Sequence, residues 1–560
     1  MSADRRRSLP GLPIVLGIVL ALAMTWPLAL YLGRDVPGEY GDPFFDAWQV
    51  SWFGHALIHQ PLDLFQGNRF WPDPDSLAYN DVMLGYAPAG LFGMGSPGAA
   101  MLVHNILIVF AYALAFVGAY LLARELGARW PGAIVAGAAF AYAPGRLSPV
   151  RHLGVLSSGG IPLTLFLLIR GYRRNNPRWV IAGWLVATWQ MTLGFSLGIQ
   201  FGYLLLVLAV IAGVYWLRGA RRNVSRAVVG ATAGGIALLT LVVALQAQPY
   251  FRVRDAHPEA ARTSDKVAFL SPRPKSFLVA PPENAVWGDR TAERRDTLLW
   301  PIEQALFPGI TITLLAILGL WSKVYPASLR IGLGVGVVVA GVLSLGLPHY
   351  PDAERGFTPY RLLYKYGPGW DSIRTPGRLN TLTSLGLALL AAAGLCLIVR
   401  WVRGLSVLRD DRRRTAASLG VAGVLAGAVL LEGFGSIPHW RTPALPASVA
   451  EAPAPQFHLP SDYPHDLIYS WWSVEGFPKM VNGAGSFEPS TLVLARSVAA
   501  GFPDSASVDY LRGLGVRSVI LHPSLAFGTP WQDAARRPVD GLPLTREDRG
   551  DVVIYRLAAG

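Results

Sequence analysis

Residues 12–32 read LPIVLGIVLALAMTWPLALYL and contain no charged side chain. Because an α-helix rises about 1.5 Å per residue, about 20 residues are enough to cross a hydrocarbon core roughly 30 Å thick. This stretch therefore predicts a membrane-spanning helix. A cleaved signal peptide is the alternative interpretation. It is disfavoured because no small-residue cleavage site precedes the aromatic and proline-containing end, and because many further apolar segments follow.

Further apolar runs predict an α-helical polytopic membrane protein with about eleven spans. After the first, these runs cover residues 99–123, 131–145, 154–170, 179–195, 197–217, 227–247, 304–322, 330–347, 379–401 and 416–436. The third to fifth spans are interrupted by Pro and Gly, which leaves open that two of them are partly re-entrant. The composition agrees with this class, because 52% of the residues are hydrophobic and only 15% are charged.

The charge of the chain is explained by membrane topology. The formal net charge is +13, yet the arginines cluster between apolar segments. This pattern does not favour nucleic-acid binding, so we expect no nucleic-acid partner. Cys396 is the only cysteine, which excludes a disulfide framework or a thiolate metal site within one chain. The abundance of Ala, Gly, Pro and Arg indicates a bacterial source, and hence the inner cell membrane.

The arginine-rich connections predict the orientation, since Lys and Arg are retained on the cytoplasmic side of a membrane. A cytoplasmic N-terminus places all of these connections inside, at residues 4–8, 170–178, 218–226 and 402–414. The predicted outer segments are then residues 34–97, 248–303 and 348–378, together with an extracytoplasmic C-terminal tail.

Two domains are expected, a transmembrane domain at 1–436 and a small soluble α/β domain at 437–560, joined by a proline-rich linker. In the second domain, strands are predicted at 466–472 (DLIYSWW), 516–522 (VRSVILH) and 551–557 (DVVIYRL), and a capped helix at 505–515 (SASVDYLRGLG). Its sequence contains no nucleophile motif, glycine-rich phosphate loop or metal-ligand cluster. We therefore interpret it as a packing or recognition module.

The first outer segment carries carboxylates among aromatic residues, beginning with GDPFFDAW at 41–48. Asp42 and Asp46 are four residues apart, so they share one face if the segment is helical. Repulsion and partial desolvation would then raise at least one pKa toward the range of a general base. The alternative is capping: Asp42 precedes Pro43 as an N-cap would, and Asp81 also stands at the start of an apolar stretch.

Cations on the predicted outer side form a second set of candidates. They are Arg146, Arg151 and His152 between two spans, and Arg374 and Arg378 just before another span. Positive charge outside runs against the topology rule, and a lipid phosphate at the outer leaflet would explain it, because guanidinium groups match phosphate oxygens. The alternatives are pairing with acids of the outer segments, snorkelling, and, for His152, a structural hydrogen bond.

The order of these parts, and motifs spread over nearly the whole chain, resemble the GT-C superfamily of glycosyltransferases that use polyprenyl-phosphate sugars. The chain looks still more similar to a group of bacterial multi-spanning proteins related to YfhO-like membrane proteins. The motifs are GDPFFDAWQVSWFGHAL (41–57), NRFWPDPDSLAYNDVMLG (68–85), RHLGVLSSGGIPLTLFLLIR (151–170), EQALFPGI (303–310), LLYKYGPGWDSIRTPGRL (362–379), MVNGAGSFEP (480–489) and YLRGLGVRSVILH (510–522).

This resemblance implies an inverting glycosyl transfer at the outer face, in which an acid deprotonates an acceptor hydroxyl. Asp42 matches the acid after the first span, and Asp81 sits where related sequences often have Glu, so these two are the catalytic candidates that the resemblance implies. Arg374 and Arg378 match the basic pair before a late span. Asp46 departs from the Asn of related sequences, so we keep it as a substrate-binding candidate and not as the base.

The expected partners are membrane lipid, a polyprenyl-phosphate-linked sugar, and a glycan, lipid or protein acceptor. No cofactor is certain, and a divalent ion held by Asp42 and Asp46 is an open alternative. We expect the outer acids and guanidinium groups to meet in one outward cavity. The competing functions are a lipid or glycan transporter or flippase, which would place charges near the bilayer midplane, and a non-catalytic envelope assembly protein.

Overall fold

The computed structural model describes residues 11–218, 224–348, 356–405 and 410–559, which form two compact units. The helical unit contains 1–29, 107–245 and 262–438, and the mixed unit contains 30–106, 246–261 and 439–560. The tail therefore shares a unit with the segment that follows the first apolar helix. The arginines at 4–8, on which the predicted orientation partly depends, lie outside the described residues.

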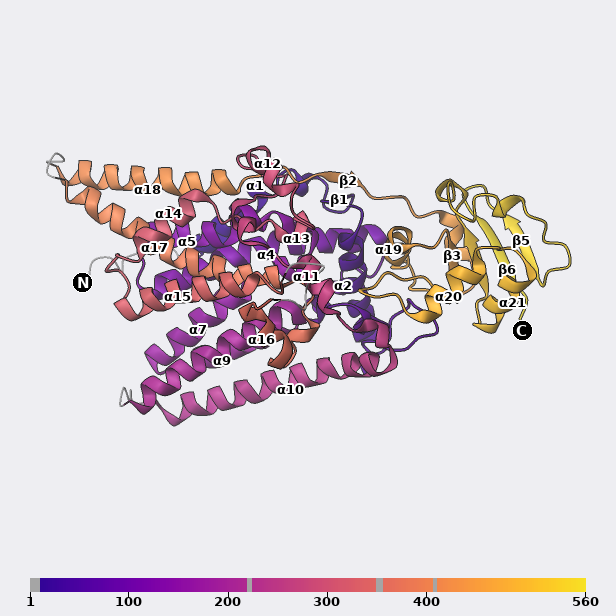
Figure 1. Ribbon diagram of the computed structural model, residues 1–560, viewed down its shortest axis with the longest axis horizontal. Coiled ribbons are helices and arrows are strands. Elements are labelled where there is room, and N and C mark those ends of the chain that lie inside the picture. The colour runs from indigo at the N-terminus through magenta and orange to yellow at the C-terminus, as the bar shows by residue number, and fades with distance from the viewer. Residues whose placement is uncertain (1–10, 219–223, 349–355, 406–409, 560) are drawn as a thin grey trace. The chain divides into compact units, whose positions relative to one another are not determined.

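Apolar helices long enough to cross a membrane dominate the fold (Figure 1). Among the described residues there are seven: Pro97–Leu126 (α4), Leu153–Arg174 (α6 and α7), Phe195–Tyr215 (in α9), Arg226–Ala256 (α10), Ala327–Ser344 (α15), Pro376–Arg403 (η10 and α17) and Asp411–Gly433 (α18). Shorter apolar helices are Leu12–Met24 (α1), Trp130–Tyr142 (α5) and Ile310–Gly319 (α14). The chain is thus a multi-pass membrane protein, but the predicted count of about eleven spans is not confirmed.

The first apolar helix is shorter than predicted. α1 ends at Met24, and only a short 3₁₀ turn, Leu28–Leu30, follows it within the stretch predicted as one span. The cause is Pro27, which has no N–H to donate and whose ring clashes with the carbonyl of the preceding turn. α8 (Pro177–Met191) likewise covers most of a predicted span with only 15 residues.

Helix α17 (Asn380–Arg403) is the centre of the helical unit and packs against α5, α14, α15 and α18. Glycines allow its close contact with α14. A Cβ atom at Gly394 would lie 1.9 Å from the Leu315 carbonyl oxygen, and one at Gly319 would lie 2.0 Å from that of Leu390. Small residues of this kind let membrane helices approach closely.

The mixed unit contains a four-stranded sheet with the strand order β3-β4-β6-β5. Its strands are β3 (Gln456–Leu459), β4 (Ser518–Leu521), β6 (Val553–Leu557) and β5 (Leu544–Asp548). β3 and β4 are parallel, and the other neighbours are antiparallel. The predictions for 516–522, 551–557 and the helix at 505–515 are confirmed by β4, β6 and α21 (Ser505–Gly513), which Asp504 caps.

The strand predicted at 466–472 is wrong, because these residues belong to helix α19 (Tyr463–Trp472). The Asp462 side chain accepts a hydrogen bond from the His465 backbone N–H, and Pro464 stands in the first turn, so this is a capped helix start. A short apolar run does not by itself distinguish a strand from a buried helix.

Helix α2 (Asp42–His59) belongs to the mixed unit and packs against α3 (Ala87–Gly90) and α19. Its N-cap is Gly41, and Asp42 is the first helical residue, so the alternative interpretation of Asp42 as the N-cap is wrong. The contact with α3 needs glycines on both sides. A Cβ atom at Gly90 would lie 1.9 Å from the Val50 carbonyl oxygen, and one at Gly54 would lie 2.1 Å from the Gly90 carbonyl carbon.

Candidate functional site

The three predicted acids lie in the mixed unit, two of them on helix α2. Asp42 and Asp46 are one helical turn apart and so share a face, as the spacing predicted. Asp42 is half-buried, Asp46 is buried and Asp81 is exposed. Asp42 stands in the first turn of α2, where the partial positive charge of the helix N-terminus favours a carboxylate.

Gln49 connects the segment that contains Asp81 to helix α2. Its buried side-chain amide donates a hydrogen bond to the Asp81 carbonyl oxygen at 3.2 Å and accepts one from the Met83 backbone N–H at 3.0 Å. Tyr250 donates a further hydrogen bond to the Asn80 carbonyl oxygen at 2.9 Å. The backbone on both sides of Asp81 is therefore held in place.

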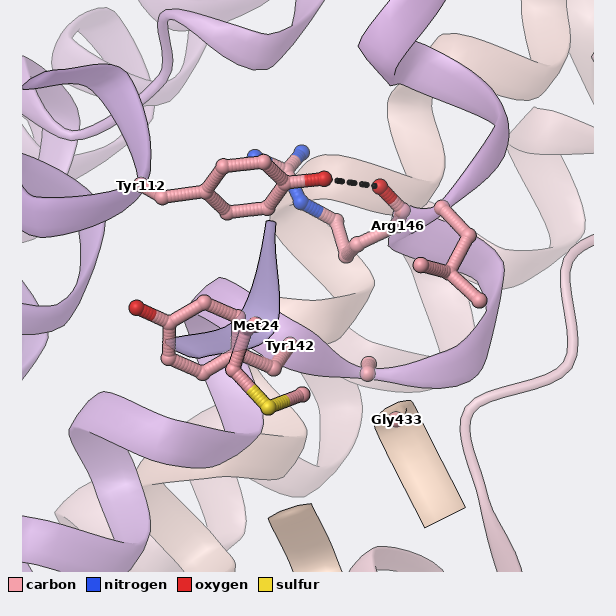
Figure 2. A pocket seen from close by; sticks show the side chains of 7 residues that line it. Met24, Tyr112, Tyr142, Arg146 and Gly433 are labelled. Atoms are coloured by element: carbon pink, nitrogen blue, oxygen red, sulfur yellow. Dashed lines mark hydrogen bonds between the residues drawn. The ribbon is translucent and has the colours of Figure 1, made fainter. Parts of the chain in front are cut away.

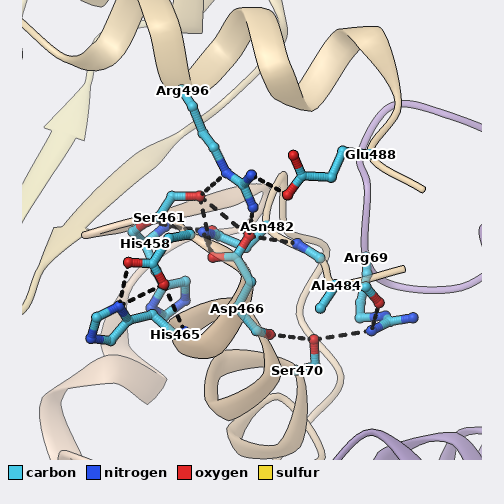
Figure 3. A network of polar contacts seen from close by, with 12 residues as sticks. Arg69, His458, Ser461, His465, Asp466, Ser470, Asn482, Ala484, Glu488 and Arg496 are labelled. Carbon is cyan, nitrogen blue, oxygen red and sulfur yellow. Dashed lines mark hydrogen bonds and ion pairs between the residues drawn. The ribbon is translucent and has the colours of Figure 1, made fainter. Parts of the chain in front are cut away.

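Arg69 is a buried cation beneath α2 that the sequence analysis did not single out; it is only 1% exposed. Its guanidinium group lies 3.8 Å from the ring centre of Trp48 and donates hydrogen bonds to the Ser470 hydroxyl and the Ala484 carbonyl oxygen (Figure 3). Burial lowers the pKa of Arg69 to about 9, so the side chain stays charged at neutral pH. It also lies 5.0 Å from the ring centre of Phe45, so it connects helix α2 to residues 470 and 484 of the same unit.

Asp466 of α19 is the centre of a buried polar network in the same unit (Figure 3). Its carboxylate accepts hydrogen bonds from the Arg496 guanidinium at 2.9 Å, the Asn482 side chain at 2.9 Å and the Gly483 N–H at 3.1 Å. Burial raises the pKa of Asp466 to about 6, against the opposing effect of Arg496. The MVNGAGSFEP motif thus has a structural role, because its residues Asn482 and Gly483 donate hydrogen bonds to Asp466.

The five predicted cations lie in the helical unit, and all of them except Arg146 gather around two acids. Arg151 forms an ion pair with Glu283. The Glu303 carboxylate lies 2.6 Å from the Arg378 guanidinium and 3.5 Å from Nε2 of His152. We call these five residues, with Arg374, the cation cluster.

The balance of charge in the cation cluster is positive. Burial alone would raise the pKa of Glu303, but the charges of Arg378 and His152 outweigh burial, and Arg374 adds to them, so this pKa lies below its ordinary value. Arg374 is exposed and forms no hydrogen bond or ion pair with any residue that the structure describes. One guanidinium group therefore remains available for an anion.

The local backbone explains how the cluster is held. Arg151 ends the 3₁₀ turn Ser148–Arg151, and Arg378 lies in the turn Pro376–Leu379. A Cβ atom at Gly377 would lie 2.9 Å from the Glu303 carbonyl oxygen, so glycine permits the close approach of these two segments. The TPGR sequence thus positions Arg378 beside Glu303.

A second buried arginine, Arg146, lies in the helical unit and is 4% exposed (Figure 2). Its guanidinium group donates hydrogen bonds to the Leu156 carbonyl oxygen and the Ser158 hydroxyl, and Tyr112 donates to its backbone carbonyl. Burial lowers the pKa of Arg146 to about 10, so this cation persists at neutral pH. The pocket beside it is too tight to admit water, and we interpret Arg146 as a packing element.

The sequence analysis missed Glu283 and Glu303, the counter-charges of the cluster. Glu303 opens the EQALFPGI motif, which was the one available signal. For a metal, the α2 face offers only two carboxylates, and no group of three or more His, Cys, Asp or Glu side chains could hold an ion among the residues described. These donors are a poor fit, and we derive no step through an ion.

Comparison with known proteins finds a similar fold among solved structures. No family model and no curated protein matches the chain. Arabinofuranosyltransferase AftD from Mycobacteria has a TM-score of 0.58 at 14% identity, over 98% of this chain and 41% of its own. ArnT from Cupriavidus metallidurans, bound to undecaprenyl phosphate, has a TM-score of 0.46 at 14% identity, and the match covers 98% of this chain and 99% of that chain. The oligosaccharyltransferase AglB from Archaeoglobus fulgidus, in complex with an inhibitory peptide and a dolichol-phosphate, has a TM-score of 0.40 at 12% identity. The match covers 92% of this chain and 69% of that chain.

The likeness to AftD shows that this chain shares the fold of part of that protein. At 14% identity it shows the fold alone, and this chain spans less than half the length of that protein. The closer relation to YfhO-like proteins stays a prediction.

Proposed function

We propose that the protein is an inverting membrane glycosyltransferase. It moves a sugar from a polyprenyl-phosphate donor to a glycan, lipid or protein acceptor at the outer face of a bacterial inner membrane. In this proposal the N-terminus is cytoplasmic, and residues 437–560 form the extracytoplasmic domain. The observation that carries the proposal is the positive balance of the cation cluster, with Arg374 exposed and unpaired among the described residues.

The cation cluster suits a phosphate that becomes a leaving group. As the sugar departs, negative charge grows on the phosphate oxygens, and guanidinium groups fixed in advance stabilise that charge without reorganising. Glu303 and Glu283 hold Arg378 and Arg151 in position, and Arg374 supplies the free donor. In this role the acids hold their paired cations in position, and Arg374 leaves the cluster with a positive balance.

Asp42 is the proposed general base. The acceptor O–H gives its proton to the Asp42 carboxylate, and the acceptor oxygen forms a bond to the anomeric carbon. The bond from that carbon to the phosphate oxygen breaks, and its electron pair stays on the phosphate. Asp46 and Asp81 are proposed to orient the acceptor through hydrogen bonds to its other hydroxyls.

Asp42→Asn tests the base directly. Asn keeps the size of the side chain but cannot accept the proton, so we expect transfer to fall by about 100- to 10,000-fold. Turnover is measured on purified protein in lipid, beside membrane abundance and thermal unfolding.

Asp63→Asn is the matched control, because Asp63 is an exposed acid in the same predicted outer segment, and this change should leave turnover unchanged. Full activity of the Asp42→Asn protein would remove Asp42 as the base. Movement of intact donor across the membrane without cleavage would favour the flippase function instead.

A further inference from the structure

Two exposed aromatic rings of the mixed unit lie close to the proposed base. Tyr40 is 49% exposed and Trp440 is 52% exposed, and their ring centres lie 6.4 Å apart with the ring planes inclined at 56°. Only Gly41 separates Tyr40 from Asp42 in the sequence. The Tyr40 ring centre also lies 5.5 Å from that of Phe44, in the first turn of α2. The rings are therefore attached to the same turn of helix as the proposed base.

A short pair of strands brings Trp440 to this place. Strand β1 (Asp35–Pro37) pairs with strand β2 (His439–Arg441) in antiparallel register, with Val36 opposite Trp440 (Figure 1). The first residues of the tail thus lie against the segment that leads into α2. The surroundings of the proposed base are built from both stretches of chain.

Two hydrogen bonds across this strand pair hold the rings in place. Nε1 of Trp440 donates to the Gly38 carbonyl oxygen at 3.2 Å, and the Tyr40 hydroxyl donates to the Arg441 carbonyl oxygen. Each ring is thus fixed by the backbone of the opposite stretch, while about half of each side chain stays exposed. Rings that are already fixed lose little conformational freedom when a ligand packs on them.

Anchoring at the membrane surface is the alternative role for such rings, because Trp and Tyr are common at the lipid interface. In that role the ring body faces the lipid, and its polar atom faces water or headgroups. Here the polar atoms of both rings bind the protein backbone instead. This arrangement favours a ligand that contacts the ring faces.

The position beside Asp42 indicates which ligand this is. In the proposed reaction the acceptor places one hydroxyl at Asp42, so its other atoms extend over the neighbouring residues. A sugar has hydroxyls at its edge and an apolar C–H face, and faces of this kind pack on Trp and Tyr rings. The Glu39 carboxylate supplies hydrogen-bond acceptors nearby, since its Oε1 lies 3.4 Å from where a Cβ atom of Gly41 would be.

We propose that Tyr40 and Trp440 bind the sugar ring of a carbohydrate acceptor and so direct its hydroxyl to Asp42. This inference rests on the proposed function and narrows its acceptor to a glycan or to the glycan part of a glycolipid. A Ser or Thr side chain of a protein acceptor has no such ring to pack on them. The rings bind the acceptor and take no part in the proton transfer.

Binding is tested on the purified full chain in lipid nanodiscs, with 5-fluorotryptophan in place of tryptophan. Trp440→Phe identifies the fluorine NMR signal of residue 440 by its loss. Titration with the methyl glycosides of glucose, galactose, mannose and N-acetylglucosamine should shift this signal saturably for at least one of them. Asp42→Asn protein should show the same shift, because binding requires no proton transfer.

Tyr40→Ala should weaken this binding by about 3- to 10-fold, the effect of one lost ring contact. Phe527→Ala is the matched control, because Phe527 is an aromatic residue of the same unit that is 85% exposed and lies outside the strand pair. It should bind as the wild type does. A signal that none of the four glycosides shifts would overturn the proposal. If a nitroxide on the lipid acyl chains then broadens it strongly, the rings are membrane anchors.

Turnover distinguishes this inference from the proposed function. Trp440→Ala should raise the KM for the acceptor by about 3- to 10-fold and leave the KM for the donor unchanged. An unchanged acceptor KM would overturn the inference and leave the proposed function standing. Saturable glycoside binding by a protein that transfers no sugar would overturn the proposed function and leave the two rings as a sugar-binding site.

Discussion

The Glu303 carboxylate lies beside two of the predicted cations, Arg378 and His152. Nothing in the sequence around these three residues indicates that they are neighbours. Arg378 and His152 stood out because they are positive residues on the side where topology disfavours them. Glu303 had no such signal, since an acid before an apolar segment is ordinary. Pairing between residues 151 apart in the sequence depends on tertiary structure, so only the cationic half of this cluster was predictable.

Removal of the Glu303 charge should destabilise the protein. The side chain is 11% exposed, and Glu303→Gln leaves the buried Arg378 guanidinium without its counter-charge. We expect a loss of about 3–5 kcal/mol in the free energy of unfolding. Glu293→Gln is the control, because Glu293 is an exposed acid of the same predicted outer segment. Equal unfolding temperatures for the two variants would contradict the ion-pair interpretation.

The same ion pairs predict an acid-dependent stability. The folded-state pKa of Glu303 lies below its ordinary 4.5, so these pairs stabilise the fold fully above pH 4.5. The stabilisation is lost as the pH falls through the lower, folded-state value. Thermal unfolding measured from pH 7 to pH 3 should show a steeper decline for wild type than for Glu303→Gln. Parallel curves would show that Glu303 is not linked to stability.

At the scale of single elements, prediction succeeded where the local pattern decides the structure. β4, β6 and α21 follow from apolar runs and from the Asp504 cap. α19 was missed because its seven-residue apolar run fits either a strand or a helix, and the Asp462 cap that decides it was overlooked. The glycine contacts between α2 and α3 are invisible in the sequence, since they join residues from different elements.

Gly90→Ala should disturb the support of helix α2. The new methyl group would meet the Val50 carbonyl oxygen at 1.9 Å, so α3 must move away from α2, at a cost of at least about 1–3 kcal/mol. Thermal unfolding and protease sensitivity measure the effect. Gly95→Ala is the matched control, because no atom lies within 4 Å of the position of its Cβ. Equal stability of the two variants would argue against tight α2–α3 packing.

At the scale of the whole molecule, hydropathy predicted the class of protein but not its span count. Seven described helices are long enough to cross a membrane, and three shorter ones show that local breaks such as Pro27 shorten the apolar runs. The mixed unit gathers three stretches of chain that are far apart in the sequence. Long-range packing of this kind leaves no local pattern, so the joining of the tail with the first outer segment was not predictable.

The most direct measurement is the release of sugar-free polyprenyl phosphate by the purified full chain in lipid, supplied with polyprenyl-phosphate sugars and glycan acceptors. The account predicts that wild-type protein releases this lipid from at least one donor in step with glycosylation of an acceptor, and that Asp42→Asn does not. Donors that all remain intact, or equal release by both proteins, would contradict it.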